Sequence, residues 1–246
     1  MFNKITNTIC AVITIVAVIP LILEGFSVNI MLIYLILIVL IYTVPFLCKH
    51  RGKILNIILY YIGTHKYNVT LRETIYEFLS RTDMRHEKHF ILCSRINGLN
   101  EYTTRFGWSK EGELNVEPLV QNQIIARKWD NDKMKYLTLL FDRYYKKGES
   151  INTGILLDNL KDEEKKSLLY LSTGIFDRTK TVRLIVKLNR DLKPKNIFLN
   201  YYKQYFDYFP DGVKPLNYDY ENLKIEYTEN YPRKNSKYVI TWDFDE

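Results

Sequence analysis

Cysteine and histidine are scarce in this chain: three cysteines and four histidines occur among 246 residues. So few cysteines exclude a disulfide framework and indicate a reducing compartment. His86 and His89 could share a metal ion on a helix, but they fall at an expected helix–strand junction with no third ligand nearby. We therefore expect neither a metal nor another cofactor.

The motifs of common catalytic sites are also missing. The chain contains no Walker loop, dinucleotide fingerprint, nucleophile elbow, Cys-x-x-Cys pair or His-Glu-x-x-His segment. Its acidic run around Asp162–Glu164 alternates with lysines, which is typical of a solvated segment. The sequence predicts a protein that is not an enzyme, and an active site assembled from scattered residues is the alternative.

Charged residues are nearly absent from the first 48 positions. Ile5–Leu23 and Val28–Cys48 contain none, and Glu24–Ser27 joins them. A membrane-spanning helix needs roughly 20 apolar residues, so we predict a two-helix transmembrane hairpin at residues 1–48. A cleaved secretory signal is the alternative, but no small-residue cleavage site precedes Val28.

Basic residues follow the second apolar run directly. Lys49, Arg51 and Lys53 stand there, whereas the connector between the runs carries only Glu24. The positive-inside rule then predicts a multi-pass protein of the inner (plasma) membrane with both termini in the cytoplasm. Residues 49–85 are expected to form a juxtamembrane neck and a short amphipathic helix, and the helix begins with a capping box at Thr70–Glu73.

From residue 86 to residue 246 the apolar pattern has a period of two, which indicates strands. We expect hairpins around Asn97-Gly98 and Asp130–Asp132, and further strands at Thr181–Leu188, Leu223–Tyr227 and Tyr238–Phe244. For Phe198–Phe209 both helix and strand fit, and strand is preferred. The predicted fold class is membrane-anchored α plus all-β: a transmembrane hairpin followed by an antiparallel β-sandwich or barrel.

Arginines lie close to large aromatic residues along the expected hairpins. The chain has a net charge of +7 and contains 20 tyrosines against 12 phenylalanines. A guanidinium group suits phosphate and an aromatic ring suits a nucleobase, so these neighbours predict a nucleotide ligand. The candidate ligand-binding residues are Arg95, Arg105, Trp108, Arg127, Trp129, Arg143 and Tyr144. The simpler interpretation is that such rings cap the core and such arginines keep the surface soluble.

The hairpin (Ile5–Leu23, Val28–Cys48), the basic stop (Lys49, Arg51, Lys53) and the β-rich domain together resemble a known class. They are similar in layout to the two-transmembrane, β-strand-rich effectors of bacterial anti-phage signalling, which are CBASS-like membrane effectors. The resemblance implies that a nucleotidyltransferase makes a cyclic or linear oligonucleotide second messenger, which the β-domain senses. A homo-oligomer of the membrane helices then forms a pore or ion channel in the lipid bilayer. The alternative is a membrane-tethered β-sandwich adaptor that binds a protein partner, with no ligand or pore.

Overall fold

The computed structural model describes residues 37, 39, 43, 51–62, 65–79, 84–107, 113–131, 134–160 and 169–244. The chain divides into two compact units, Met1–Leu55 and Asn56–Glu246. A helix at residues 51–62 crosses this boundary, and every described strand belongs to the second unit. The second unit therefore holds the sheets, the cores and the candidate sites.

Within the described ranges the chain forms fourteen strands. They are β1 (Tyr67–Phe78), β2 (Met84–Ser94), β3 (Leu99–Gly107), β4 (Glu113–Pro118), β5 (Ile124–Asn131), β6 (Met134–Tyr145), β7 (Ser150–Leu160), β8 (Tyr170–Gly174), β9 (Thr179–Lys187), β10 (Pro194–Tyr202), β11 (Gly212–Pro215), β12 (Tyr218–Asp219), β13 (Lys224–Asn230) and β14 (Lys237–Phe244).

A seven-stranded sheet forms the main layer, in the order β12-β13-β9-β1-β2-β7-β4. β1 lies at its centre, antiparallel to β2 and parallel to β9. This strand has buried apolar side chains on both faces, Tyr76 and Phe78 on one and Ile75 on the other. Aromatic and β-branched residues of this kind favour a strand with a neighbour on each side.

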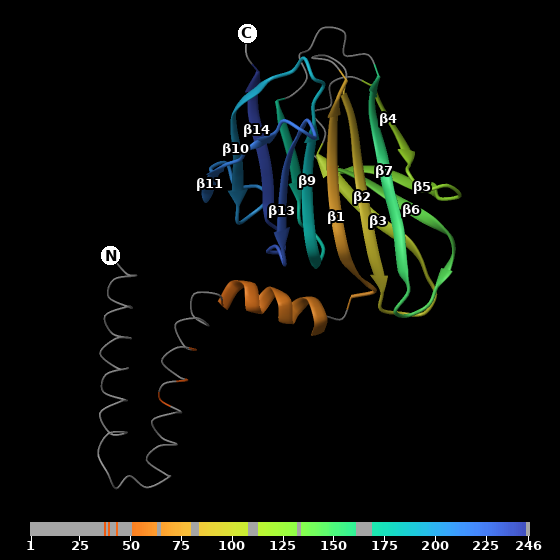
Figure 1. The fold of residues 1–246 in the computed structure, drawn as a ribbon. Coiled ribbons are helices and arrows are strands. Elements are labelled where there is room, and N and C mark those ends of the chain that lie inside the picture. Colours follow the sequence, from red (N-terminus) through yellow and green to blue (C-terminus); the bar gives the residue numbers. More distant parts are fainter. Residues whose placement is uncertain are drawn as a thin grey trace, which may run out of the picture. The chain divides into compact units, whose positions relative to one another are not determined.

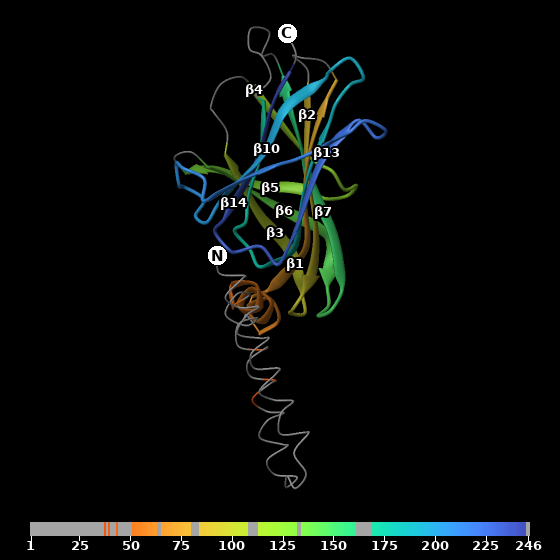
Figure 2. The same ribbon diagram turned by 60° about the vertical axis from the view of Figure 1, so that its left-hand side comes forward.

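Two smaller sheets cover one face of the large sheet. One has the order β11-β10-β14-β8 and the other β3-β6-β5. In Figure 1, β10, β11 and β14 lie toward the left and β3, β5 and β6 toward the right, and Figure 2 shows the same layers from a second direction. The first sheet encloses a core around Trp242 and Leu184, and the second a core around Phe90 and Leu139. The domain is therefore two-layered, with its second layer split in two.

Polar side chains are buried where the two cores meet. Arg72 and Thr74 on β1, Lys88 on β2 and Tyr102 on β3 point into this region, each less than a tenth exposed. The Thr74 hydroxyl donates to Thr173 Oγ1 at 3.3 Å, and Arg72 Nη2 donates to the Tyr102 hydroxyl at 3.3 Å. We call these five residues the polar seam. A buried polar group is costly unless it is hydrogen-bonded, so the seam constrains how the two cores fit together.

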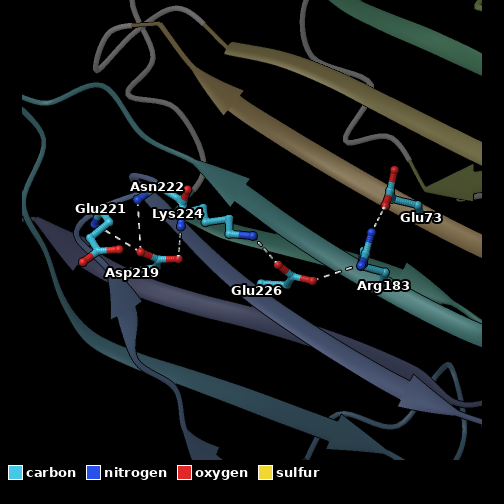
Figure 3. A network of polar contacts seen from close by, with 7 residues as sticks. All are labelled: Glu73, Arg183, Asp219, Glu221, Asn222, Lys224 and Glu226. Carbon is cyan, nitrogen blue, oxygen red and sulfur yellow. Dashed lines mark hydrogen bonds and ion pairs between the residues drawn. The ribbon is translucent and has the colours of Figure 1, made fainter.

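Charged residues line the opposite face of the large sheet (Figure 3). Arg183 on β9 lies between Glu73 on β1, at 3.2 Å, and Glu226 on β13, at 3.1 Å. Lys224 pairs with Glu226 at 2.6 Å, and the Asp219 carboxylate accepts hydrogen bonds from Asn222 in the turn between β12 and β13. These pairs are partly exposed, and pairs of this kind contribute only about 0–1 kcal/mol each.

The amphipathic helix expected from Thr70 is wrong, because these residues form β1. The Thr70–Glu73 spacing imitates a helix cap, but pairing with β2 and β9 determines the local structure. The expected hairpin at Asn97-Gly98 is also wrong. Gly98 does take a turn conformation with φ of 82°, yet β2 pairs with β1 and β7 whereas β3 pairs with β6. The chain leaves one layer there and enters the other.

The expected membrane-anchored fold class requires correction. Among the described residues, no helix is both long and apolar enough to cross a bilayer. The helix at 51–62 spans roughly 18 Å at 1.5 Å per residue, short of a hydrocarbon core of about 30 Å. Apart from Leu37, Val39 and Thr43, the two expected spans lie outside the described residues. The structure is mostly β, and it does not bear out the transmembrane hairpin, the multi-pass inner-membrane location or the pore. Nor is the β-part purely antiparallel, since β1 and β9 run parallel.

Candidate functional site

The predicted ligand-binding residues occupy separate places. Trp108 lies outside the described residues. Arg143 forms an ion pair with Glu149 at 3.3 Å and lies over the Tyr145 ring, while Tyr144 is 70% exposed. Arg95 donates from Nη1 to the Tyr60 carbonyl at 3.4 Å, so it caps the last turn of the helix at 51–62. These positions do not combine into one site.

Arg105, Arg127 and Trp129 do share a surface, the outer face of the β3-β6-β5 sheet. The β5–β6 hairpin, which the sequence predicted correctly, pairs Trp129 with Tyr136 and Arg127 with Thr138. On the other side of β6, Arg105 pairs with Tyr136. The outward row Trp129–Tyr136–Arg105 thus follows from strand register alone, because cross-strand partners lie on the same face.

The rings in this row are stacked. The Trp129 and Tyr136 centroids are 5.1 Å apart with 12° between the planes, and Trp129 is 44% exposed. Arg105 Nη1 lies 3.5 Å from the Tyr136 hydroxyl, the long limit of a hydrogen bond, and its guanidinium is 6.0 Å from that ring centroid. Tyr136 holds one face of the indole in place, and a substantial part of the indole remains accessible to a ligand.

The row continues onto the neighbouring sheet. The Arg105 guanidinium lies 3.6 Å from the Phe176 centroid, and Phe176 packs on Tyr205 at 4.7 Å. Lys237 follows, 5.7 Å from the Tyr205 ring and 4.0 Å from that of Tyr202. We call the series Trp129, Tyr136, Arg105, Phe176, Tyr205 and Lys237 the cation–aromatic row. Burial lowers the pKa of Lys237 and raises that of Tyr205, which marks this end as partly shut off from water.

Gly174 makes room for the far end of the row. A Cβ at this position would lie 2.5 Å from the Tyr205 ring and 2.6 Å from the Phe176 ring. Any larger residue would therefore push both rings away. The sequence drew attention to the aromatic run around Tyr205, but nothing in it indicated Phe176, Lys237 or the role of Gly174.

The row offers flat ring faces and positive charges, and exposed Arg127 lies on the same face of β5, two residues before Trp129. Aromatic faces stack on planar rings, and arginine and lysine attract anions. A nucleobase carrying a phosphate has both features. The two histidines that the sequence analysis considered as a metal pair, His86 and His89, lie on β2, where an odd spacing puts them on opposite faces. His89 Nε2 contacts Glu87 at 2.8 Å, whereas the His86 ring packs on Tyr76 at 4.3 Å.

An ion pair between a buried arginine and a half-buried aspartate supports the loop that carries Phe176. Arg72, whose side chain is 4% exposed, contacts Asp177 at 2.9 Å and donates from Nη1 to the Gly174 carbonyl at 3.2 Å. The Tyr102 hydroxyl donates to the same carboxylate at 3.4 Å. These contacts hold both ends of the β8–β9 loop, so they position Phe176 against Arg105.

Comparisons with known proteins give little beyond a distant likeness of fold. No protein-family model matches the chain, and no curated protein matches it. Among solved structures, a candidate protease from Parabacteroides distasonis matches with a TM-score of 0.41 and 6% identity, covering 72% of this chain and 40% of that one. An M1 zinc metallopeptidase from Deinococcus radiodurans matches with a TM-score of 0.33 and 9% identity, covering 73% and 43%. The matched region thus spans less than half of each of those proteins, and likenesses this distant carry no statement about function.

Proposed function

We propose that the unit Asn56–Glu246 is a binding module, not an enzyme, and that its ligand is an oligonucleotide. The observation that carries the proposal is the exposed indole of Trp129, held against Tyr136 in line with Arg105. A base would stack on Trp129, and Arg127 on the same strand would face its phosphate. Stacking of one base contributes about 1–3 kcal/mol.

The resemblance to anti-phage effectors supplies the biological part of this proposal. In that setting the oligonucleotide is a second messenger made by a nucleotidyltransferase, and its binding changes how copies of the chain associate. A ligand shifts such an equilibrium only by its differential affinity for the two states. Sedimentation of the full chain with and without ligand tests this part.

Binding itself is tested by titrating the full chain, kept in solution by a neutral detergent, with a panel of cyclic and linear di- and trinucleotides. For a ligand that binds, Trp129→Ala should weaken the affinity by tenfold or more, since 1.4 kcal/mol corresponds to a factor of ten. Tyr220→Ala is the matched control, because Tyr220 is an exposed ring (75%) outside the row. No binding tighter than millimolar, or equal affinities for wild type and Trp129→Ala, would refute the proposal.

A protein-binding adaptor is the second candidate function, and one feature favours it. The β10–β11 loop exposes Phe206 by 73%, Tyr208 by 90% and Phe209 by 86%. Hydrogen bonds from Lys203 N to Asp211 at 2.7 Å and from Gln204 N to Asp207 at 3.1 Å hold this loop in shape. Exposed rings on an ordered loop are typical of interface hot spots. An adaptor should lose its protein partner in Phe209→Ser and keep it in Trp129→Ala, whereas an oligonucleotide sensor should respond in the opposite way.

A further inference from the structure

A pocket of about 260 Å³ lies where β1 begins, outside the cation–aromatic row. Its lining residues come from three separate parts of the chain: His65, Lys66 and Tyr67 lead into β1, Asp177 and Arg178 lie in the β8–β9 loop, and Lys234 lies in the β13–β14 turn. No pattern in the sequence connects these residues. Their side chains meet only because β1 and β9 are parallel neighbours and β13 pairs with β9.

The lining is strongly basic. Lys66, Arg178 and Lys234 contribute three cations, and Asp177 is the only acid among the lining residues. The Asp177 carboxylate already contacts buried Arg72 at 2.9 Å and accepts a hydrogen bond from the Tyr102 hydroxyl at 3.4 Å. Arg72, which does not line the pocket, therefore neutralises its negative charge. Positive charge is left over on the pocket side.

His65 supplies an imidazole to the pocket. Partial burial, and then the charges of Arg178 and Lys234, lower the pKa of His65, and Asp177 opposes the shift only weakly. A neutral imidazole at neutral pH can still donate one hydrogen bond. The pocket therefore combines three cations with a neutral donor.

Hydrogen bonds hold the pocket walls before any ligand arrives. The Arg178 guanidinium donates from Nη1 to the Leu59 carbonyl, and the Arg178 carbonyl accepts from Val69 N at 3.0 Å. Asn235, next to Lys234, has a φ of 64° and donates to the Ile175 carbonyl at 2.6 Å. A guanidinium carries five N–H donors, so Arg178 keeps donors for a ligand. Preorganised walls reduce the entropic cost of binding.

We propose that this pocket binds a phosphate or pyrophosphate group. Fixed cations and N–H donors around a small cavity match the charge and the acceptor oxygens of such an anion. The volume lies just below the range of about 300–1,000 Å³ that holds drug-sized ligands, so it suits a compact group and not a whole oligonucleotide. The group could belong to a free phosphorylated compound or to the oligonucleotide proposed above, and the anion site stands independently of that proposal.

Inorganic pyrophosphate is the direct probe, because it has no base to stack on Trp129. Calorimetric titration of the full chain in neutral detergent at pH 7 should show saturable binding. Lys66→Gln and Lys234→Gln should each weaken it at least tenfold, and Lys234→Arg should retain it. Both lysines are exposed, so the substitutions leave the core intact. Lys193→Gln is the matched control: it removes the same charge from an exposed lysine that does not line the pocket, and it should keep the affinity within twofold.

The outcomes separate this site from the nucleotide proposal. Pyrophosphate binding that survives Trp129→Ala and fails in the two pocket variants supports the anion site even if no oligonucleotide binds. If the pocket variants also weaken oligonucleotide binding, the oligonucleotide is the source of the phosphate. If they weaken only pyrophosphate binding, the source is a free phosphorylated compound. The inference is overturned by binding no tighter than millimolar, by unchanged affinity in both pocket variants, or by equal weakening in Lys193→Gln.

Discussion

Lys88 should make the folded chain more stable at alkaline pH than at neutral pH. Its side chain is buried in the polar seam, 7% exposed, with the amine 5.3 Å from the Phe106 ring centroid. Burial, with a smaller contribution from the charge of Arg72, lowers the pKa of Lys88 from 10.5 to about 7. Between these two values the unfolded chain holds a proton that the folded chain has released, so the free energy of unfolding rises with pH in this window.

The size of the effect follows from the shift. Lowering a pKa from 10.5 to about 7 corresponds to a cost of about 5 kcal/mol for the charged, folded form, at 1.36 kcal/mol per unit. Burial of Lys88 therefore lowers the free energy of unfolding by the full amount well below pH 7 and by about 4 kcal/mol at pH 7. The loss of stability disappears as the pH approaches 10.5. Attraction between the ammonium and the Phe106 ring offsets a fraction of this cost.

The substitution Lys88→Met removes the titrating amine and keeps most of the side-chain volume. Urea unfolding of the full chain, followed by tryptophan fluorescence, to which buried Trp242 contributes, gives the stability of each variant from pH 7 to pH 10. The stability gain of Lys88→Met over wild type should be largest at pH 7 and shrink by about 1.4 kcal/mol for each pH unit above it. Lys187→Met, at an exposed position on β9, should show a constant difference. Parallel stability curves for wild type and Lys88→Met would refute the reasoning.

Three further predictions use the same unfolding assay. Burial and the charge of Lys88 hold the pKa of His86 well below 6.5, so below pH 6.5 the folded ring stays neutral while the unfolded ring takes up a proton. As the pH drops below 6.5, the free energy of unfolding should therefore decrease less steeply in His86→Gln than in wild type. Asp177→Asn removes the counter-ion of buried Arg72 and should cost about 1–3 kcal/mol, since Asp177 itself is partly exposed, whereas exposed Asp191→Asn should cost almost nothing; equal costs would show that the ion pair is not needed. Gly154→Ala places a Cβ 2.6 Å from the Lys88 carbonyl oxygen and should cost about 1–3 kcal/mol, and an unchanged urea midpoint would contradict the described β2–β7 pairing.

The candidate site could be predicted in part, and its residues explain why. Arg105 and Trp129 were recognisable because each stands beside other rings and cations in the sequence, and Trp129 meets Tyr136 through a short hairpin with a visible turn. Phe176 lies 71 positions beyond Arg105, which it contacts at 3.6 Å. Arg95 looked equally suitable as a ligand-binding residue, but it contacts the carbonyl of Tyr60 on the preceding helix. Proximity in the sequence cannot distinguish these cases.

Local pattern determined the strands themselves: in Val182–Leu188 and Tyr238–Phe244 every second residue is apolar, which favours a strand whatever its partners are. Only the tertiary structure decided which strands pair. In the tertiary structure the segment at Thr70 is a central strand, β1 is parallel to β9, and β2 and β3 belong to different sheets. The same pairing places Lys66, Arg178 and Lys234 around one pocket. The physical reason is that burial and hydrogen bonding of a strand are completed by neighbours remote in the chain, and the free energy of those contacts exceeds the propensity of any short segment.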